Sequence, residues 1–301
     1  MNLIKPKKLN LGDTISIIAT SGECDKDKIY SAKSYFECKG YKVKLSKNIF
    51  DKNNYLAGND EDRANAINCA FEDSEVAAII CARGGYGALR IIDKIDYNLI
   101  RNNPKIFCGY SDVTILNAMI LKRAGLITFS GPMAQSDFSS ENICMYTEDK
   151  LYKALTSDLI ELKADYPKYY SKDITAEGIV FGGNLSTISS LCGTDFVPDE
   201  KFIFFTEDLN EPAYKVDRYI TQLFNISKFK NNLQAIVLGD FLDIDNNEYF
   251  DNLIYSIAEK NNIPIISGFK LTHDIQKDTI PIGGAAVLNG DTITIKDYLL
   301  R

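Results

Sequence analysis

The chain has 301 residues, of which 45% are hydrophobic and 25% charged, so it can bury a sizeable core as one large domain or two of ordinary size. Its 34 lysines and arginines against 41 aspartates and glutamates give a net charge of −7, which argues against a nucleic-acid partner because nucleic-acid binding depends on neutralising phosphates. No apolar run approaches the roughly 20 residues of a membrane span, and the N-terminus lacks the apolar core of a signal peptide, so we expect no membrane partner either.

The first half of the chain alternates strand-like and helix-like segments. Its strands are apolar on both faces, a pattern typical of a parallel sheet covered by helices. We therefore predict an α/β domain of flavodoxin-like or Rossmann-like type over residues 1–135, with sites at the carboxyl ends of its strands. The expected strands are residues 14–19, 41–46, 75–82, 106–110 and 126–130, and the expected helices are 27–38, 61–71, one beginning at 88, and 113–123.

The second half begins after a looser, polar and aromatic stretch. We interpret residues 136–173 as a linker and residues 174–301 as a second, smaller domain of mixed α/β type. Asn289-Gly290, between two short apolar alternations, is a hairpin turn signal. The other expected strands are residues 202–205, 235–238 and 263–267, and the expected helices are 216–224 and 250–260.

The cysteines indicate a reducing compartment. There are seven, an odd number, with no C-x-x-C pair among them. Several lie inside apolar stretches, where a reduced thiol packs as a small hydrophobic side chain. We therefore expect a cytoplasmic protein. The cysteines are at positions 24, 38, 69, 81, 108, 144 and 192.

His273 is the single histidine of the chain. A zinc hydrolase site with two or three histidine ligands is thereby excluded, and no cysteine cluster replaces it. If histidine chemistry occurs, His273 performs it. The plain alternative is a histidine that packs or lies exposed in a loop, at about even odds for an isolated histidine.

Ser111 lies where a predicted strand passes into a predicted helix within a few residues. Gly109 leaves room for a sharp bend, which is the logic of a nucleophile elbow, although the pattern is not G-x-S-x-G. A backbone N–H at the following helix start, that of Asp112, is suited to hold an oxyanion. Taken alone, Ser111 is equally explained as a helix N-cap.

A glycine-rich turn, residues 83–87, follows another buried strand. Glycines let a ligand approach the backbone closely, but the spacing matches neither a dinucleotide nor a phosphate loop. The N–H of Gly85 is a candidate second oxyanion donor. The alternative is a tight turn without further function.

Acidic residues follow the strand predicted at 202–205. Glu207 at the strand end is suited to orient His273 and to stabilise its imidazolium form. Asp208 and Glu211 compete for that role. All three also fit a simple helix entry, where acidic residues are common.

Together these segments resemble the LD-carboxypeptidase family of serine peptidases along nearly the whole chain. The resemblance implies a Ser111–Glu207–His273 triad, a cleft between the domains and a homodimer. The sequence differs from the family pattern at Thr272-His273-Asp274, where family members often have Gly-His-Gly. The resembling segments are residues 55–63, Arg83-Gly84-Gly85-Tyr86-Gly87, Gly109-Tyr110-Ser111-Asp112, residues 182–186, Glu207-Asp208 and residues 268–273.

The resemblance also implies a reaction, the cutting of the bond between the L-centre of a diamino acid and a terminal D-alanine in a murein tetrapeptide. No metal or organic cofactor is needed. Arg83 is a candidate for binding the terminal carboxylate. Two alternatives stay open: a microcin-immunity-type peptidase acting on aminoacyl nucleotides, for which a tryptophan shelf is absent, and a catalytically silent ligand-binding protein.

Overall fold

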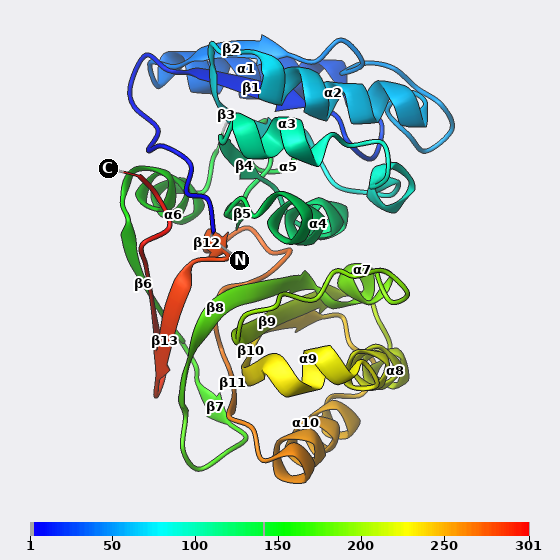
Figure 1. Cartoon of the computed structure of the whole chain (residues 1–301), viewed down its shortest axis with the longest axis vertical. Coiled ribbons are helices and arrows are strands. Elements are labelled where there is room, and N and C mark those ends of the chain that lie inside the picture. The colour runs from blue at the N-terminus through cyan, green and yellow to red at the C-terminus, as the bar shows by residue number, and fades with distance from the viewer. Residues whose placement is uncertain (1–2, 141, 301) are drawn as a thin grey trace.

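The computed structural model describes residues 3–140 and 142–300. These residues form two β-sheets, each accompanied by helices, and the two sheets follow one another along the long axis of the molecule (Figure 1). The first sheet belongs mainly to the N-terminal half of the chain and the second mainly to the C-terminal half. The expected α/β fold with a second mixed domain is confirmed.

The first sheet has the order β12-β5-β4-β3-β1-β2. Strands β1 to β5 are parallel, in the flavodoxin-like order 2-1-3-4-5. All five predicted strands are present. Strands β1, β3 and β4 are largely buried on both faces, whereas β2, at the edge of the sheet, is only partly buried. The bounds are β1 (Thr14–Ile18), β2 (Lys42–Leu45), β3 (Val76–Cys81), β4 (Ile106–Cys108), β5 (Thr128–Ser130) and β12 (Ile280–Ile282).

Side-chain caps fix several helices around this sheet. Asp25 accepts a hydrogen bond from the N–H of Lys28 at the start of α1, and Asn59 and Asp62 form a capping box at the start of α2. The single helix expected from residue 88 is instead a short 3-10 turn followed by α3, because Asp96 caps a new helix. The bounds are α1 (Lys26–Cys38), α2 (Asp60–Glu72), η1 (Ala88–Ile91), α3 (Tyr97–Asn102), η2 (Ser111–Val113), α4 (Thr114–Ala124) and α5 (Ala134–Asp137).

The second sheet has the order β6-β14-β13-β8-β9-β10-β11-β7. Its centre, β8 to β11, is parallel, and antiparallel strands complete both sides. The strands are β6 (Leu159–Lys163), β7 (Lys168–Tyr169), β8 (Thr175–Asn184), β9 (Phe202–Leu209), β10 (Leu233–Leu242), β11 (Ile265–Ser267), β13 (Ala285–Asn289) and β14 (Thr292–Lys296). The helices are α6 (Met145–Thr156), α7 (Leu185–Ser189), α8 (Ala213–Phe224), α9 (Ser227–Asn232) and α10 (Asn247–Asn261).

Regular elements also occupy the segment 136–173, which the sequence suggests as a linker. Helix α6 and strands β6 and β7 lie there, and both strands belong to the second sheet. Strand β6 buries alternate residues, Ile160 and Leu162, between exposed ones. Such a short alternation is difficult to detect within a polar stretch.

The C-terminal half also returns to the first sheet. Strand β12 pairs antiparallel with β5, so that Ile280 lies opposite Ser130 and Ile282 opposite Thr128. Figure 1 shows β12 beside β5, between the two halves of the molecule. The chain therefore joins the halves through a shared sheet as well as through side-chain packing.

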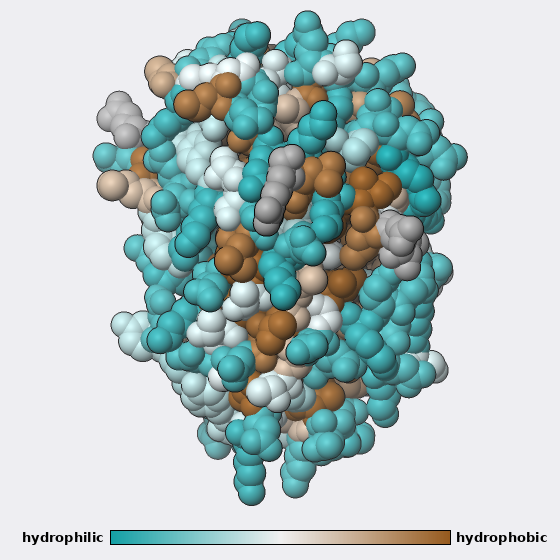
Figure 2. Space-filling view, turned by 60° about the vertical axis from the view of Figure 1, so that its left-hand side comes forward, coloured by the Kyte–Doolittle hydropathy of each residue, from teal (hydrophilic) through white to brown (hydrophobic). Residues whose placement is uncertain are grey.

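The surface in Figure 2 is mainly hydrophilic, with hydrophobic residues interspersed among charged and polar ones. Beneath it the buried apolar side chains of both sheets form one continuous core. Within the described residues, no helix is both long enough and apolar enough to cross a bilayer.

Candidate active site

Ser111 occupies a strained turn between β4 and α4. Its φ is +61°, a left-handed backbone conformation that serine seldom adopts and that costs of the order of 1–3 kcal/mol. A methyl group at Gly109 would lie 2.8 Å from Cγ1 of Val113, so glycine is required for the chain to turn here. Asn117 donates a hydrogen bond of 2.8 Å to the carbonyl of Gly109 and fixes the bend. This geometry is that of a nucleophile elbow without its second glycine.

The glycine turn after β3 lies against Ser111. A methyl group at Gly84 would lie 2.9 Å from Cβ and 3.0 Å from Oγ of Ser111, and 3.5 Å from the backbone nitrogen of Asp112. Gly85 has a φ of +118°, which favours glycine. The glycine turn that contains Gly85 therefore approaches Ser111 and the N–H of Asp112 through Gly84.

The side chain of Asp112 has a different task from its N–H. It is buried and accepts a 2.9 Å hydrogen bond from the N–H of Ala88, at the end of the glycine turn. Burial raises the pKa of Asp112, and hydrogen bonds from Ser21 and Ala88 act in the opposite direction. The carboxyl group thus ties the serine turn to the glycine turn.

Arg63 holds the end of the same glycine turn by a hydrogen bond to Gly87. The sequence did not single out this residue. Its guanidinium is fully buried and donates to the carbonyls of Thr20 at 3.0 Å and Gly87 at 2.8 Å. It is also paired with Asp60. An arginine that follows three acidic residues at the start of a helix was the available signal, but it is equally typical of an exposed helix face.

His273 and Glu207 are in direct contact. Nδ1 of His273 lies 2.7 Å from Oε2 of Glu207, whose side chain is 6% exposed. Burial raises the pKa of Glu207, and the hydrogen bond to His273 opposes that shift. Since Nδ1 faces the carboxylate, Nε2 is the ring nitrogen left for proton transfer.

The other two carboxylates considered from the sequence have different partners. Asp208 accepts hydrogen bonds from Asn184 Nδ2 at 2.8 Å and from the N–H of Ser186 at 2.7 Å. Glu211 pairs with Lys215 at 3.3 Å. Of the three carboxylates, Glu207 is the one that contacts His273.

Asn184 is a further residue that the sequence did not single out for a role. It lies beside Glu207 in the register of β8 and β9, and its Nδ2 is 3.3 Å from Oε1 of Glu207. Its backbone N–H donates to Thr114 Oγ1 at 3.2 Å, at the start of α4. Asn184 therefore connects the carboxylate of the C-terminal half with the helix that follows Ser111.

Tyr110 connects the serine turn with His273. The ring of Tyr110, the residue before the serine, meets the His273 ring edge-on with centroids 5.1 Å apart. Among the hydrogen bonds of the described residues, none joins the Ser111 hydroxyl to His273. Catalytic hydrogen bonds are often long without substrate and shorten when it binds.

The loop that carries His273 is held by the segment interpreted as a linker. Thr147 in α6 donates to the carbonyl of Ile275 at 2.6 Å and accepts from the N–H of Lys277 at 3.0 Å. Lys277 forms an almost fully buried ion pair with Asp137 of α5. The placement of the histidine therefore depends on both halves of the chain.

The two larger pockets that adjoin these residues have different linings. One, of about 500 Å³, is lined by Gly22, Glu23, Tyr55, Arg83, Gly85 and Tyr86. The other, of about 240 Å³, has His273, Tyr110 and Lys277 among its lining residues. Arg83, which the sequence suggests as the residue that binds the terminal carboxylate, thus lines the larger pocket, whereas His273 lines the smaller one.

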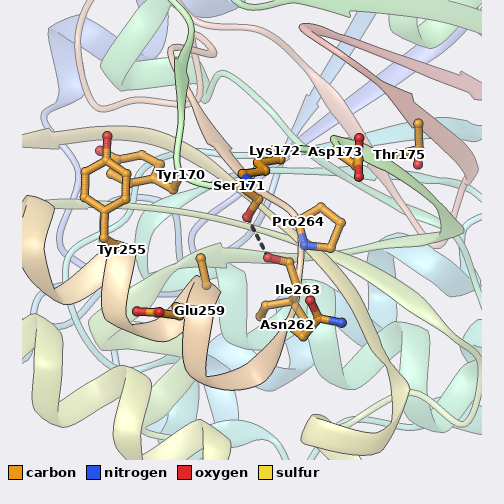
Figure 3. A pocket seen from close by; sticks show the side chains of 11 residues that line it. Tyr170, Ser171, Lys172, Asp173, Thr175, Tyr255, Glu259, Asn262, Ile263 and Pro264 are labelled. Atoms are coloured by element: carbon orange, nitrogen blue, oxygen red, sulfur yellow. Dashed lines mark hydrogen bonds between the residues drawn. The ribbon is translucent and has the colours of Figure 1, made fainter.

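A third hollow lies between α10 and the segment after β7, in the C-terminal half of the chain. It has a volume of about 630 Å³, and its Ser171 hydroxyl donates to the carbonyl of Ile263 at 2.8 Å (Figure 3). Tyr170 and Tyr255 pack there with ring centroids 4.8 Å apart. None of the candidate catalytic residues lines it.

Among the described residues, no three His, Cys, Asp or Glu side chains gather closely enough to hold a metal ion.

Comparison with known families agrees with this geometry. The model of the LD-carboxypeptidase N-terminal domain matches residues 15–131, and that of the C-terminal domain matches residues 177–288. The chain belongs to the LD-carboxypeptidase family. The first match contains Ser111 and the glycine turn, and the second contains Glu207 and His273.

Individual LD-carboxypeptidase relatives span the chain almost completely. A protein of Bacillus subtilis (strain 168) named probable murein peptide carboxypeptidase is 35% identical, over 95% of this chain and 91% of its own length. The structure of muramoyltetrapeptide carboxypeptidase from Oxalobacter formigenes has a TM-score of 0.87 and 30% identity, and covers 95% of this chain and 100% of that one. A MccF-like protein from Bacillus anthracis has a TM-score of 0.89 and 30% identity, with 97% and 99% covered.

Proposed function

We propose that this chain is a serine carboxypeptidase that removes the terminal D-alanine of murein tetrapeptides by cutting its bond to the L-centre of the diamino acid. The observation that carries the proposal is the 2.7 Å contact of His273 with the buried Glu207 beside the strained Ser111. The names of the relatives, murein peptide and muramoyltetrapeptide carboxypeptidase, support the substrate.

In the proposed reaction Ser111 Oγ attacks the carbonyl carbon of the scissile peptide bond, and Nε2 of His273 accepts its proton. The N–H groups of Asp112 and Gly85 bind the tetrahedral oxyanion. The carbon–nitrogen bond breaks as His273 returns the proton to the amine of D-alanine. Water, activated by His273, then hydrolyses the acyl-enzyme and releases the tripeptide. Glu207 keeps Nδ1 of His273 protonated and stabilises the imidazolium.

A second candidate keeps this machinery and changes the substrate. The likeness to a MccF-like protein favours hydrolysis of an aminoacyl nucleotide of the microcin type. The chain contains no tryptophan, so a tryptophan shelf for a base is excluded. A ligand-binding protein without catalysis is the remaining alternative.

The proposal also includes a cytoplasmic location and a homodimeric state. All seven cysteines, each within the described residues, are free thiols, which supports action in the cytoplasm. A homodimer is expected from the family resemblance. Sedimentation of the purified protein at micromolar concentration measures it directly, and a monomer would contradict it.

The decisive experiment compares three peptides that differ at their C-terminus. The murein tetrapeptide ending in D-alanine, the pentapeptide ending in D-Ala-D-Ala, and a tetrapeptide ending in L-alanine are incubated separately, and free alanine is measured with time. We expect release from the first alone, because a shift of about 1 Å at the reacting carbonyl can cost on the order of a hundredfold in rate. Equal release from all three would indicate a general carboxypeptidase.

Variants and labelling separate the remaining alternatives. Ser111→Ala and His273→Ala are each expected to lower kcat by at least about 10³-fold, and the double variant by little more, since triad members act as a unit. Ser190→Ala, at an exposed serine of the α7 cap, is the matched control. Failure of a serine-directed phosphonate to label Ser111 would favour the silent ligand-binding protein. Hydrolysis of an aminoacyl-sulfamoyl adenosine with no muropeptide cleavage would favour the immunity-type enzyme.

A further inference from the structure

The 500 Å³ pocket beside Ser111 is built at the carboxyl ends of β1 and β3, where the strand order of the first sheet reverses. Backbone hydrogen bonds connect its walls, from Gly22 N–H to the carbonyl of Gly84 at 3.2 Å and from Glu23 N–H to that of Tyr55 at 3.3 Å. Ligands of open α/β sheets bind at this position. Two of its lining residues, Arg83 and Gly85, flank Gly84, which approaches Ser111 closely, so the pocket adjoins the turn that contacts the candidate nucleophile.

The charged groups of this pocket favour an anion. Nη1 of Arg83 donates to the carbonyl of Glu23 at 3.2 Å, which holds the guanidinium in place while its other edge makes no hydrogen bond among the described residues. The Glu23 carboxylate is paired with Lys52 at 2.6 Å, so it does not neutralise Arg83. A half-buried arginine with free donors is suited to bind a carboxylate.

Two exposed aromatic rings complete the pocket. Tyr55 is 81% exposed and Tyr86 is 55% exposed, and both line it together with Arg83. Tyrosine offers an apolar face to a carbon chain and a hydroxyl to polar groups. The pocket therefore suits a ligand that has both an aliphatic stem and a carboxylate.

The direction of a bound peptide follows from the histidine. His273 must lie on the side of the leaving amine, since it returns a proton to that nitrogen. His273 lines the smaller pocket of about 240 Å³, a size that suits a single small residue. The acyl part of the peptide is then left for the larger pocket, which Arg83 lines and His273 does not.

We propose that this pocket binds the acyl part of the substrate and that Arg83 recognises a free carboxylate carried by it, rather than the terminal carboxylate of the leaving residue. The inference rests on the proposed function. In a murein tetrapeptide such a carboxylate is available on the side chain of a diaminopimelate-type residue and on a γ-linked glutamate. A peptide with lysine in place of diaminopimelate brings an ammonium group toward Arg83 instead.

Four tetrapeptides test this recognition. All end in D-alanine; the first has diaminopimelate, the second has its side-chain carboxylate amidated, the third has lysine, and the fourth has diaminopimelate with the glutamate carboxylate amidated. We expect the peptide that lacks the recognised carboxylate to lose roughly 10- to 100-fold in kcat/KM, mainly through KM, as for a hydrogen bond to a charged group. The second and fourth peptides distinguish the two carboxylates.

Variants of Arg83 give an independent readout. Arg83→Gln is expected to lower kcat/KM on the preferred peptide to the level of its amidated form and to leave the amidated form unchanged, with partial recovery in Arg83→Lys. Arg101→Gln, at an exposed arginine of α3, is the matched control and should change nothing.

Two outcomes overturn the inference and one overturns the function. Equal rates on all four peptides would mean that no acyl carboxylate is recognised. An equal loss on all four in Arg83→Gln would place Arg83 on the terminal carboxylate. Absence of alanine release from every peptide would instead refute the carboxypeptidase function itself.

Discussion

At the scale of single residues, the nucleophile turn depends on the absence of side chains around it. Ser111 adopts its strained conformation because Gly109 lets the chain turn and Gly84 leaves space beside Cβ and Oγ. Gly84 itself has no strained φ, so glycine is needed there for space alone. Its substitution therefore tests the serine position without disturbing the backbone.

Gly84→Ala is expected to displace Ser111 and to lower kcat/KM on the order of a hundredfold, at a cost of about 1–3 kcal/mol of stability, because the added methyl group would lie 2.9 Å from Cβ of Ser111. Gly12→Ala is the matched control. Gly12 has a φ of +87° and no neighbour within 4 Å, so alanine there should cost about 1 kcal/mol of stability and leave activity unchanged. Wild-type activity in Gly84→Ala would contradict the close approach.

At the scale of elements, ion pairs connect α4, which follows the nucleophile, with α9 of the C-terminal half. Asp199 lies 3.0 Å from Lys122 of α4 and 2.5 Å from Lys228 of α9. Hydrogen bonds from Lys228 and Lys122 lower the pKa of Asp199 to about 2. The carboxylate is 53% exposed, so solvent screens much of this attraction.

The lowered pKa gives a pH dependence of definite sign. A carboxylate whose pKa is depressed on folding stabilises the protein above its unfolded pKa, and this contribution is lost as the pH falls from about 4 to about 2. Asp199→Asn should therefore lower the free energy of unfolding at pH 7 by at most about 1 kcal/mol, and the difference should shrink toward pH 3. Thermal unfolding of both proteins across this range measures it.

Asp195→Asn is the control for that series. Asp195 contacts the same two lysines at 3.4–3.5 Å and is 76% exposed, so a smaller effect is expected. A difference for Asp199→Asn that stays constant between pH 7 and pH 3 would show that the ion pairs do not contribute through the charge of Asp199.

At the scale of the whole molecule, the two halves of the chain share a β-sheet and a buried ion pair. Strand β12 of the C-terminal half completes the first sheet, and Asp137 of the N-terminal half is buried against Lys277 in the histidine loop. The proposed triad consequently draws its residues from both halves. If the C-terminal half unfolded alone, the edge of β5 in the first sheet would lose its partner β12, and Asp137 would lose its buried partner Lys277.

We therefore expect one cooperative unfolding transition. In urea, far-UV circular dichroism, near-UV circular dichroism and pulse proteolysis should give the same midpoint. Two separated transitions would indicate that the halves unfold independently and that β12 contributes little to the first sheet.

The sequence by itself determined the parallel sheet of the first half and the turns at its strand ends. Long apolar runs such as residues 75–82 have no stable place except a sheet covered on both faces, and glycine beside Ser111 marks a turn that other residues cannot make. The same local signals placed Ser111 where a strand passes into a helix, and the structure has β4 and η2 there. Local chemistry was sufficient for these features because each depends on residues close together in the chain.

Only the tertiary structure decided the contacts between distant segments. Glu207, Asp208 and Glu211 are equally acidic in sequence. The strand register puts Glu207 opposite Asn184, and the fold of the segment after β11 brings His273 to the Glu207 carboxylate. Likewise β12 is three residues long, and its pairing with β5 depends on a chain that has already folded around it. Such contacts join segments that are tens to more than a hundred residues apart in the chain, which no local pattern encodes.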